Sequence, residues 1–455
     1  MAFTQRTLLM PPLLHMTRIR FDHRKVSRFA TAFFAGLGLV LLSGCKLGDQ
    51  LHQVFSLSGP QSTMDTAGPV ARAQWDLFMV TVYVCTFIFI VVGAVLAYAQ
   101  IKFRAKSTAD EHVETPAGHG NPLVEIGLIV ASVALLVIIA IPTLRDIWYT
   151  HDVPEDEKGT AMNVTATGYQ WWFKFEYNDP DAVVKLPNNG GEIPLVTGNE
   201  LVVPAGIPVR VQLRTVDVIH SFWIPKLAGK VDMMPNRPNF LWFKAEKPGY
   251  YYGQCAEYCG ESHAIMRFRV IALSAREYAL WLENQKQPAR AVTAQSVADA
   301  ANELHVKFAS LPLDSGAALS GSPAFDADPL AGWQAMQKPE AGENAALIAQ
   351  GRKLFNDRTC VTCHMVRGQE GAGIAGPDLT HVGARSTIAA GVLENTHELM
   401  HRWLKEPNYF KPGNKMWFGG FHLLDAKGEW QPNPKLPELT DPEIDALVAY
   451  LHSLK

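Results

Sequence analysis

Two long apolar stretches constrain this chain more than any other feature of its sequence. Residues 77–99 and 123–141 are apolar almost throughout, and a short polar segment separates them. A helix that crosses a bilayer needs roughly 20 apolar residues at about 1.5 Å rise each. A pair of buried helices in a soluble protein is the alternative. Two such stretches so close together favour a hairpin of transmembrane helices.

The charges beside these stretches predict an orientation. Lys102, Arg104 and Lys106 follow the first stretch directly, whereas acidic residues follow the second. The positive-inside rule then places the loop between the stretches in the cytoplasm and the rest of the chain on the outer face. Glu125 opens the second stretch. An ionisable residue at a span is a functional candidate, although an interfacial carboxylate is the plain alternative.

The N-terminus has the features of an export signal. A basic segment precedes the apolar run 29–42, which ends in Leu-Ser-Gly before Cys45. This pattern resembles a bacterial lipobox, in which Cys45 would be lipidated and residues 1–44 removed. An uncleaved anchor helix is the alternative. Export agrees with the predicted topology, so we expect a multi-pass protein of a bacterial cytoplasmic membrane, in contact with membrane lipid.

The middle of the chain changes to a period of two. Apolar and polar residues alternate over 208–214 and 266–270, and residues 239–245 form an aromatic-rich third candidate strand. Turn residues separate these segments. Short alternating strands between turns predict an all-β sandwich or Greek-key barrel.

A set of soft metal ligands lies within this β region. Cys255, Cys259, His263 and Met266 occupy one short segment, and His220 lies upstream. Thiolate, thioether and imidazole ligands suit copper, and a second cysteine beyond the single one of a blue copper site argues for two metals bridged by two sulfurs. A disulfide is the alternative that an exported location permits. It does not account for the histidines and the methionine.

A different motif occurs near the C-terminus. Cys360, Cys363 and His364 form Cys-x-x-Cys-His, which is the attachment pattern of c-type haem. A thioredoxin-like redox pair is the alternative. Residues 441–454 have helical spacing of apolar residues, which predicts a final helix. Between the β region and this motif, residues 285–344 are rich in Ala, Ser, Gly, Pro and Gln, as in a flexible tether.

A c-type haem needs a second axial ligand, and Met416 is the candidate. It lies in Lys-Pro-Gly-Asn-Lys-Met, a loop-like segment. His397, Met400 and His401 are chemically possible rivals. They lie on a predicted helix, which we interpret as a surface face. Ligation by histidine and methionine favours a high reduction potential.

The segment from Tyr251 to Met266 resembles the dinuclear CuA motif of cytochrome c oxidase subunit II. The order of signal, two spans, copper sandwich and cytochrome c domain resembles the caa-type haem–copper oxidases. The resemblance implies six ligands of the dinuclear copper: His220, Cys255, Cys259, His263, Met266 and the backbone carbonyl of Glu257. The Glu257 side chain would also face a magnesium site shared with subunit I.

The resemblance implies roles for four more residues. Trp171 would be the point at which electrons enter the copper domain, and it would stay available to a donor. Glu125 would mark the start of a proton path, the Pro377 carbonyl would orient His364, and Met416 would bind the haem iron. The chain departs from the family in having Trp172-Phe173 where Tyr-Trp is commoner, and Trp417 where proline commonly follows the methionine.

The resemblance also implies the architecture: a multidomain membrane protein with a two-helix transmembrane hairpin, an all-β cupredoxin-like sandwich and an all-α class I cytochrome c domain. We expect a signal at 1–44, the hairpin region at 45–150, the CuA domain at 151–284, a linker at 285–344 and the cytochrome domain at 345–455.

The implied activity is that of a proton-translocating cytochrome c oxidase. Cytochrome c or another respiratory donor would reduce the haem, and electrons would pass through CuA to subunit I, where oxygen is reduced to water. Subunits I and III would be partners. Two alternatives are a CuA-containing nitric oxide reductase and a copper-delivery protein; copper binding would exclude a quinol oxidase. With a net charge of −3 and no long basic run, we expect no nucleic-acid partner.

Overall fold

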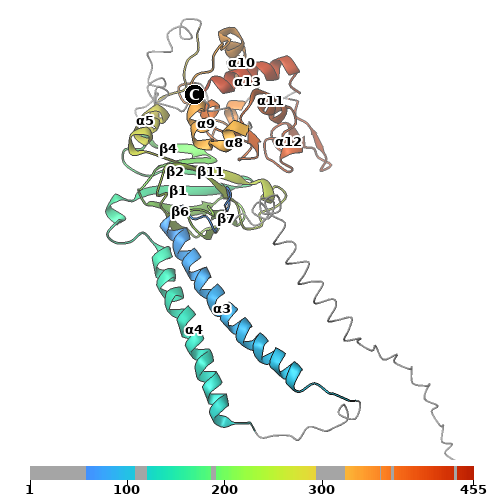
Figure 1. Ribbon diagram of the computed structural model, residues 1–455. Coiled ribbons are helices and arrows are strands. Elements are labelled where there is room, and N and C mark those ends of the chain that lie inside the picture. Colours follow the sequence, from blue (N-terminus) through green and yellow to red (C-terminus); the bar gives the residue numbers. More distant parts are fainter. Residues whose placement is uncertain are drawn as a thin grey trace, which may run out of the picture. The chain divides into compact units, whose positions relative to one another are not determined.

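The structure is a computed structural model, and it describes residues 58–107, 120–185, 191–293, 323–358, 360–369, 373–434 and 438–455. The predicted signal and Cys45 lie outside the described residues. Residues 58 to 455 form one unit. Figure 1 shows the helices and strands of this unit in chain order, from blue to red.

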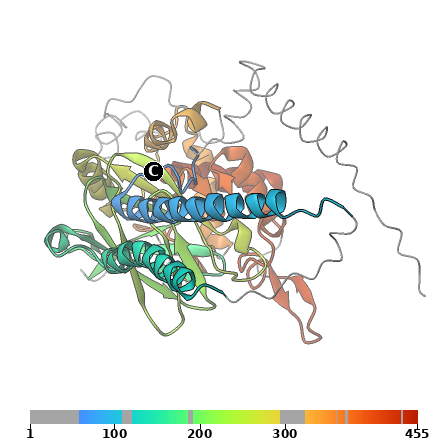
Figure 2. The same ribbon diagram turned by 60° about the horizontal axis from the view of Figure 1, so that its bottom comes forward.

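Two long helices form the predicted hairpin. They are α3 (Pro69–Lys102, 34 residues) and α4 (Pro122–His151, 30 residues), and they lie side by side (Figure 2). Asn121 caps α4 by accepting a hydrogen bond from the backbone of Leu123, and Pro122 follows at the first helical position, where no amide donor is needed. Phe89 and Leu123 are 78% and 80% exposed. Apolar surface of this kind is stable against lipid and not against water, which confirms the two predicted apolar helices.

The β region folds into two sheets. One has six strands in the order β3-β4-β2-β1-β6-β9, and the other has five in the order β5-β11-β10-β7-β8. The strands of the first sheet are β1 (Met162–Tyr169), β2 (Trp172–Tyr177), β3 (Val183–Lys185), β4 (Glu192–Gly198), β6 (Val209–Thr215) and β9 (Asn239–Phe243). Those of the second sheet are β5 (Glu200–Pro204), β7 (His220–Trp223), β8 (Lys230–Met233), β10 (Gly249–Gln254) and β11 (Arg267–Leu273). The two alternating segments are β6 and β11, and the aromatic-rich segment is β9, so the β-sandwich prediction is confirmed.

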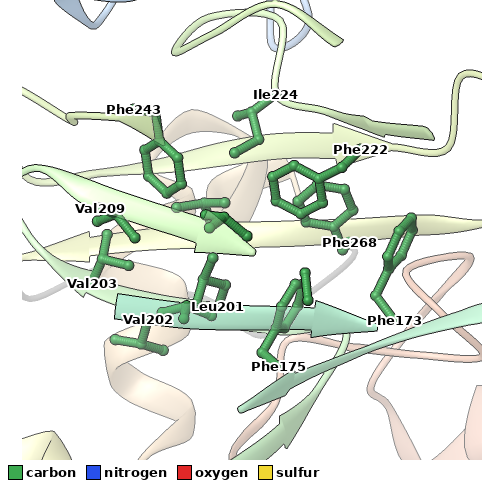
Figure 3. Close-up of a cluster of buried hydrophobic side chains, with 14 of the residues drawn as sticks. Phe173, Phe175, Leu201, Val202, Val203, Val209, Phe222, Ile224, Phe243 and Phe268 are labelled. Carbon is green, nitrogen blue, oxygen red and sulfur yellow. The ribbon is translucent and has the colours of Figure 1, made fainter. Parts of the chain in front are cut away.

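Aromatic side chains fill the core of the sandwich. Strand β2 alternates between partly buried and buried residues, and its buried face carries Phe173 and Phe175. These rings pack against Phe222 from β7 and Phe268 from β11 (Figure 3). The ring centroids of Phe222 and Phe268 are 4.5 Å apart and those of Phe173 and Phe268 are 4.8 Å apart. Such pairs add stability beyond the area that they bury.

The C-terminal region is mainly helical. Its helices are α10 (Ala345–Asp357), α11 (His397–Lys405), α12 (Pro407–Phe410) and α13 (Asp441–Ser453), with short 3-10 turns η5 (Cys360–Thr362) and η6 (Val382–Ala384). Two small hairpins pair β12 (Thr387–Ile388) with β13 (Leu393–Glu394) and β14 (His422–Leu424) with β15 (Trp430–Pro432). Helix α13 confirms the predicted final helix. It packs closely on α10 at Gly351. A Cβ there would lie 1.9 Å from the Ala446 carbonyl oxygen, so only glycine fits.

Part of the expected tether is ordered. Helix α5 (Ala275–Lys286) ends the sandwich, and α8 (Pro323–Ala327) and α9 (Pro329–Met336) precede the C-terminal region. Trp333 of α9 is 1% exposed, and its indole nitrogen donates to Glu200 Oε2 of β5 at 2.9 Å. The tether interpretation is therefore wrong for residues 323–336. A few large apolar residues among many small ones suffice to pack these helices against the sandwich.

Candidate functional site

The loop between β10 and β11 brings the sulfur ligands together. The strands pair up to Gln254 and Arg267, and the Cys255 amide then donates to the Met266 carbonyl at 2.9 Å. The loop is therefore closed at its base. Strand β7 pairs with the same strand β10 through Trp223 and Gln254, which brings His220 to the loop.

All six expected copper ligands converge on one point. The Cys255 and Cys259 sulfurs are 3.7 Å apart, well beyond the roughly 2.05 Å of a disulfide. The other distances are 3.9 Å from Cys255 Sγ to His220 Nδ1, 3.3 Å from Cys255 Sγ to the Glu257 carbonyl, 3.6 Å from Cys259 Sγ to His263 Nδ1 and 3.9 Å from Cys259 Sγ to Met266 Sδ. Donors that each lie about 2.0–2.3 Å from an ion are separated by roughly this much. The residues present therefore fit two bridged copper ions.

The site is largely buried and favours a thiolate at Cys255. His220 is fully buried, and Cys255, Cys259 and Met266 are nearly so. A hydrogen bond from the Cys259 thiol lowers the pKa of Cys255 well below its usual range, and His220 contributes in the same direction. Thiolates are the species that bind metals, so the surroundings of this pair favour the ligating form of one cysteine before any ion binds.

Two residues that the sequence did not single out, Asp217 and Gln170, hydrogen bond around the expected ligand His220. Asp217 Oδ1 is 2.8 Å from His220 Nε2, which leaves Nδ1 directed at Cys255. The backbone amide of Gln170 donates to the other carboxylate oxygen of Asp217, Oδ2, at 2.8 Å. A carboxylate behind a ligating imidazole commonly sets its tautomer. The spacing Asp-x-x-His was the signal that could have found Asp217.

Trp171 makes direct contact with residues 255–266, the segment between β10 and β11 that we call the copper loop. Its indole nitrogen donates to the Cys259 carbonyl at 2.9 Å, and Gln170 Nε2 donates to the same oxygen at 2.9 Å. Trp171 is only 7% exposed. The ring is thus held against Cys259, one of the expected copper ligands. In this conformation Trp171 is therefore largely covered, and its role as the point of electron entry stays a prediction.

The haem-binding motif lies in η5 and the turn after it. His364 Nδ1 is 2.9 Å from the Pro377 carbonyl, as the resemblance implied, so Nε2 is the nitrogen left for an iron. Burial lowers the pKa of His364, which favours the neutral, ligating imidazole. A Cβ at Gly376 would lie 2.5 Å from His364 Cε1, so glycine is needed beside the ring. Cys360 and Cys363 are free thiols, and the donor set fits a covalently bound haem.

The candidates for the second haem ligand differ in how far their side chains are buried. Met416 is half-buried in the loop after α12. Met400 is 2% exposed and packs in the core of the C-terminal region, so placing it on a surface face was wrong. The side chains of His397 and His401 are 58% and 24% exposed on the same helix. The apolar face of α11 could not be located without knowing what covers it.

The segment 411–416, which we call the methionine loop, packs against the copper loop. Ser262 Oγ donates to the Pro412 carbonyl at 2.6 Å, and the buried Lys411 ammonium donates to the Ile265 carbonyl at 3.4 Å. A Cβ at Gly413 would lie 2.8 Å from Trp171 Cη2. The methionine loop thus covers Trp171 and contacts the segment between His263 and Met266.

Glu125 and Glu257 occupy less enclosed positions. Glu125 lies in the first turn of α4, exposed, where its charge complements the helix dipole. Glu257 is half-buried, and its carbonyl rather than its carboxylate faces Cys255.

Comparisons with known proteins agree with this organisation. Family models match residues 57–145 (cytochrome c oxidase subunit II, transmembrane domain), 162–273 (cytochrome c oxidase subunit II, periplasmic domain) and 348–455 (cytochrome c). Cytochrome c oxidase subunit 2 of Alkalihalophilus pseudofirmus is 30% identical over 434 residues, which cover 95% of this chain and 98% of that protein. The chain belongs to the cytochrome c oxidase subunit 2 family.

Other members of the family match over shorter lengths. The Bacillus subtilis cytochrome c oxidase subunit 2 is 29% identical over 411 residues, covering 87% of this chain and 92% of that protein. The crystal structure of the periplasmic domain of subunit II of Bradyrhizobium japonicum cytochrome oxidase is 36% identical, covering 28% of this chain and 93% of that one, with a TM-score of 0.23. The matched domains imply a dinuclear copper site and a haem c. They do not favour the nitric oxide reductase alternative.

Replacing Cys259 with Ser tests the copper ligands. We expect loss of the mixed-valence copper resonance, because one bridging sulfur is removed, with an unchanged haem spectrum. Cys85→Ser, at an exposed position in α3, is the matched control and should leave both signals intact. A seven-line copper resonance that persists in Cys259→Ser would contradict the assignment.

Replacing Met416 with Ala tests the haem ligand. We expect loss of the weak near-infrared sulfur-to-iron band of the oxidised haem. Met400→Ala should keep this band but destabilise the C-terminal region by about 2–5 kcal/mol, because it empties a core position. The two variants are compared by absorption spectra and by thermal unfolding. The opposite pattern, with the band lost only in Met400→Ala, would show that the ligand is misassigned.

Proposed function

We propose that this chain is the electron-accepting subunit of a membrane-bound cytochrome c oxidase. It receives electrons from a respiratory donor at its C-terminal domain and delivers them through its copper domain to subunit I, which reduces oxygen to water with proton translocation. The packing of the methionine loop on the copper loop and on Trp171 supports this proposal most directly.

The described residues would hold both groups. Copper would be held by Cys255, Cys259, His220, His263, Met266 and the Glu257 carbonyl. Haem would be held by Cys360, Cys363, His364 and Met416, with Pro377 orienting His364. When bound, these groups supply one-electron redox couples.

The chain's own part in electron transfer is positioning. Trp171 is buried between the copper loop and the methionine loop, where water is excluded. Its indole hydrogen bond to Cys259 fixes the ring on the copper side, and Gly413 allows the methionine loop to approach on the other side. A donor domain in the same chain does not depend on encounter by diffusion. We therefore assign Trp171 as the point at which electrons enter from the chain's own cytochrome domain.

The orientation follows from the charges near the hairpin. Lys102, Arg104 and Lys106 follow α3 and favour the cytoplasmic side, so the copper and cytochrome domains would lie on the outer face. The partners would then be subunits I and III within the membrane and cytochrome c outside it. The half-buried Glu257 would supply a carboxylate to a magnesium site facing subunit I.

Replacing Gly413 with Ala tests this route. The added methyl group would lie 2.8 Å from Trp171 Cη2 and 2.6 Å from Glu261 Oε2, so the methionine loop must move away. We expect electron transfer from haem to copper to slow by on the order of 10-fold, because small displacements of reacting groups cost large rate factors. The rate is followed in the purified oxidase after rapid reduction of the haem, together with oxygen uptake.

Gly428→Ala is the matched control. Gly428 has a φ of 81°, close to the 77° of Gly413, but a Cβ there would meet nothing within 4 Å. Both variants carry the same backbone strain, and only Gly413→Ala separates the loops. Equal rates in the two variants would contradict the route. A wild-type complex that consumes nitric oxide but not oxygen would contradict the proposed activity itself.

Replacing Glu125 with Gln tests its role in proton delivery. If Glu125 marks the start of a proton path, turnover should fall while copper and haem content stay unchanged, since its side chain contacts neither site. The measurement is oxygen uptake with metal and haem analysis of the same preparation. Unchanged turnover would leave Glu125 as an interfacial carboxylate only.

A further inference from the structure

Three residues that the copper and haem sites do not use form a compact cluster. Glu340 follows α9, His397 begins α11, and His452 lies in the last turn of α13. Glu340 Oε2 is 2.7 Å from His397 Nε2, and Glu340 Oε1 is 3.0 Å from His452 Nδ1. One ligand atom from each of the three residues lies within 4.8 Å of the others. The carboxylate thus joins three segments of the chain.

His452 is the buried member of this cluster. Its side chain is almost fully buried, and Nε2 has no hydrogen-bond partner. The hydrogen bond of the ring is the one between Nδ1 and Glu340 Oε1. Nδ1 is the nitrogen that faces Glu340, so Nδ1 is the atom of His452 that a bound ion would use.

The surroundings favour the protonation states that bind metals. Although desolvation opposes it, hydrogen bonding from His397 and His452 holds the pKa of Glu340 below its usual range. Burial lowers the pKa of His452. The rings of His397 and His452 stack with centroids 4.0 Å apart, an arrangement in which two imidazolium charges would repel. An ionised carboxylate and neutral imidazoles are the forms that metals require.

We propose that Glu340, His397 and His452 form a binding site for a borderline divalent cation such as Zn²⁺. Two imidazoles and one glutamate are a ligand set that zinc accepts, with water at the fourth position. The side chain of His397 is 58% exposed, so it provides a route of access and room for that water. The present contacts are shorter than the spacing of donors around one ion, and the exposed His397 can move outward to open them.

Lys455 is the cation that now stands nearest to the cluster. Its ammonium lies 3.5 Å from Glu340 Oε1 and also donates to the Gly383 carbonyl at 2.8 Å. A bound metal would replace Lys455 at the carboxylate, and Lys455 would keep its carbonyl partner. The metal would fasten the end of α9, which packs on the sandwich through Trp333, to two helices of the C-terminal region.

Zinc titration of the purified oxidase, loaded with copper and haem, tests the proposal. A fluorescent zinc indicator competes for the metal, and X-ray absorption at the zinc edge reports its ligands. We expect His397→Ala and Glu340→Gln to weaken one zinc site by at least about 10-fold, with imidazole scattering reduced in His397→Ala. His452 is left unchanged because its replacement would empty a buried position.

His401→Ala is the matched control. His401 lies on the same helix but faces Asp441 and Asp445 instead of the cluster. It should bind zinc as the wild type does. Zinc binding that is the same in wild type, His397→Ala and Glu340→Gln, or that falls equally in His401→Ala, would overturn the proposal and leave the cluster as an ion-paired contact between helices. An unchanged haem spectrum shows that each variant is folded.

Discussion

The antiparallel pairing of β10 with β11 is the constraint on which the functional part of this structure depends. It joins the copper loop at both ends and brings the first and last sulfur ligands to adjacent positions. A Cβ at Gly253 would lie 2.3 Å from the Phe268 ring, so the strand pair also accepts the central aromatic side chain of the core only because glycine stands there. Core packing and ligand geometry are therefore set by the same two strands.

A buried carboxylate connects the sandwich to the C-terminal region. Glu200 is 5% exposed and accepts hydrogen bonds from the Trp333 indole, the Ser386 amide and the Ser386 hydroxyl at 2.9, 2.7 and 2.5 Å. Tyr250 in turn contacts the Ser386 hydroxyl at 2.7 Å. A buried polar group is tolerated only when such partners compensate its lost hydration. The same residue thus ties together β5, α9 and the segment after η6.

Membrane anchoring and electron transfer place opposite demands on the surface of this chain. The helices α3 and α4 leave large apolar side chains exposed for lipid, whereas Trp171 and the expected ligands His220, Cys255, Cys259 and Met266 are buried. Moving the apolar side chains of α3 and α4 from water into lipid stabilises the membrane-spanning helices. Around the buried residues, desolvation strengthens the hydrogen bonds that orient His220 and Trp171, because charges interact more strongly in a less polar medium.

Local spacing was enough to identify much of this protein. Cys360, Cys363 and His364 lie within five residues, and the copper loop holds four expected side-chain ligands within twelve residues, so short backbone segments already bring their chemistry together. The spans and the strands followed from hydropathy and alternation for the same local reason. Tertiary structure decided what depends on distant segments. Asp217 is recognisable as a positioning residue only once β7 lies beside the copper loop, and Trp171 is seen to be covered only once Gly413 packs on it. Met400 faces the core, Trp333 orders part of the linker, and Glu340 meets His397 and His452 for one physical reason: contact with segments far away in the sequence, which no local pattern records.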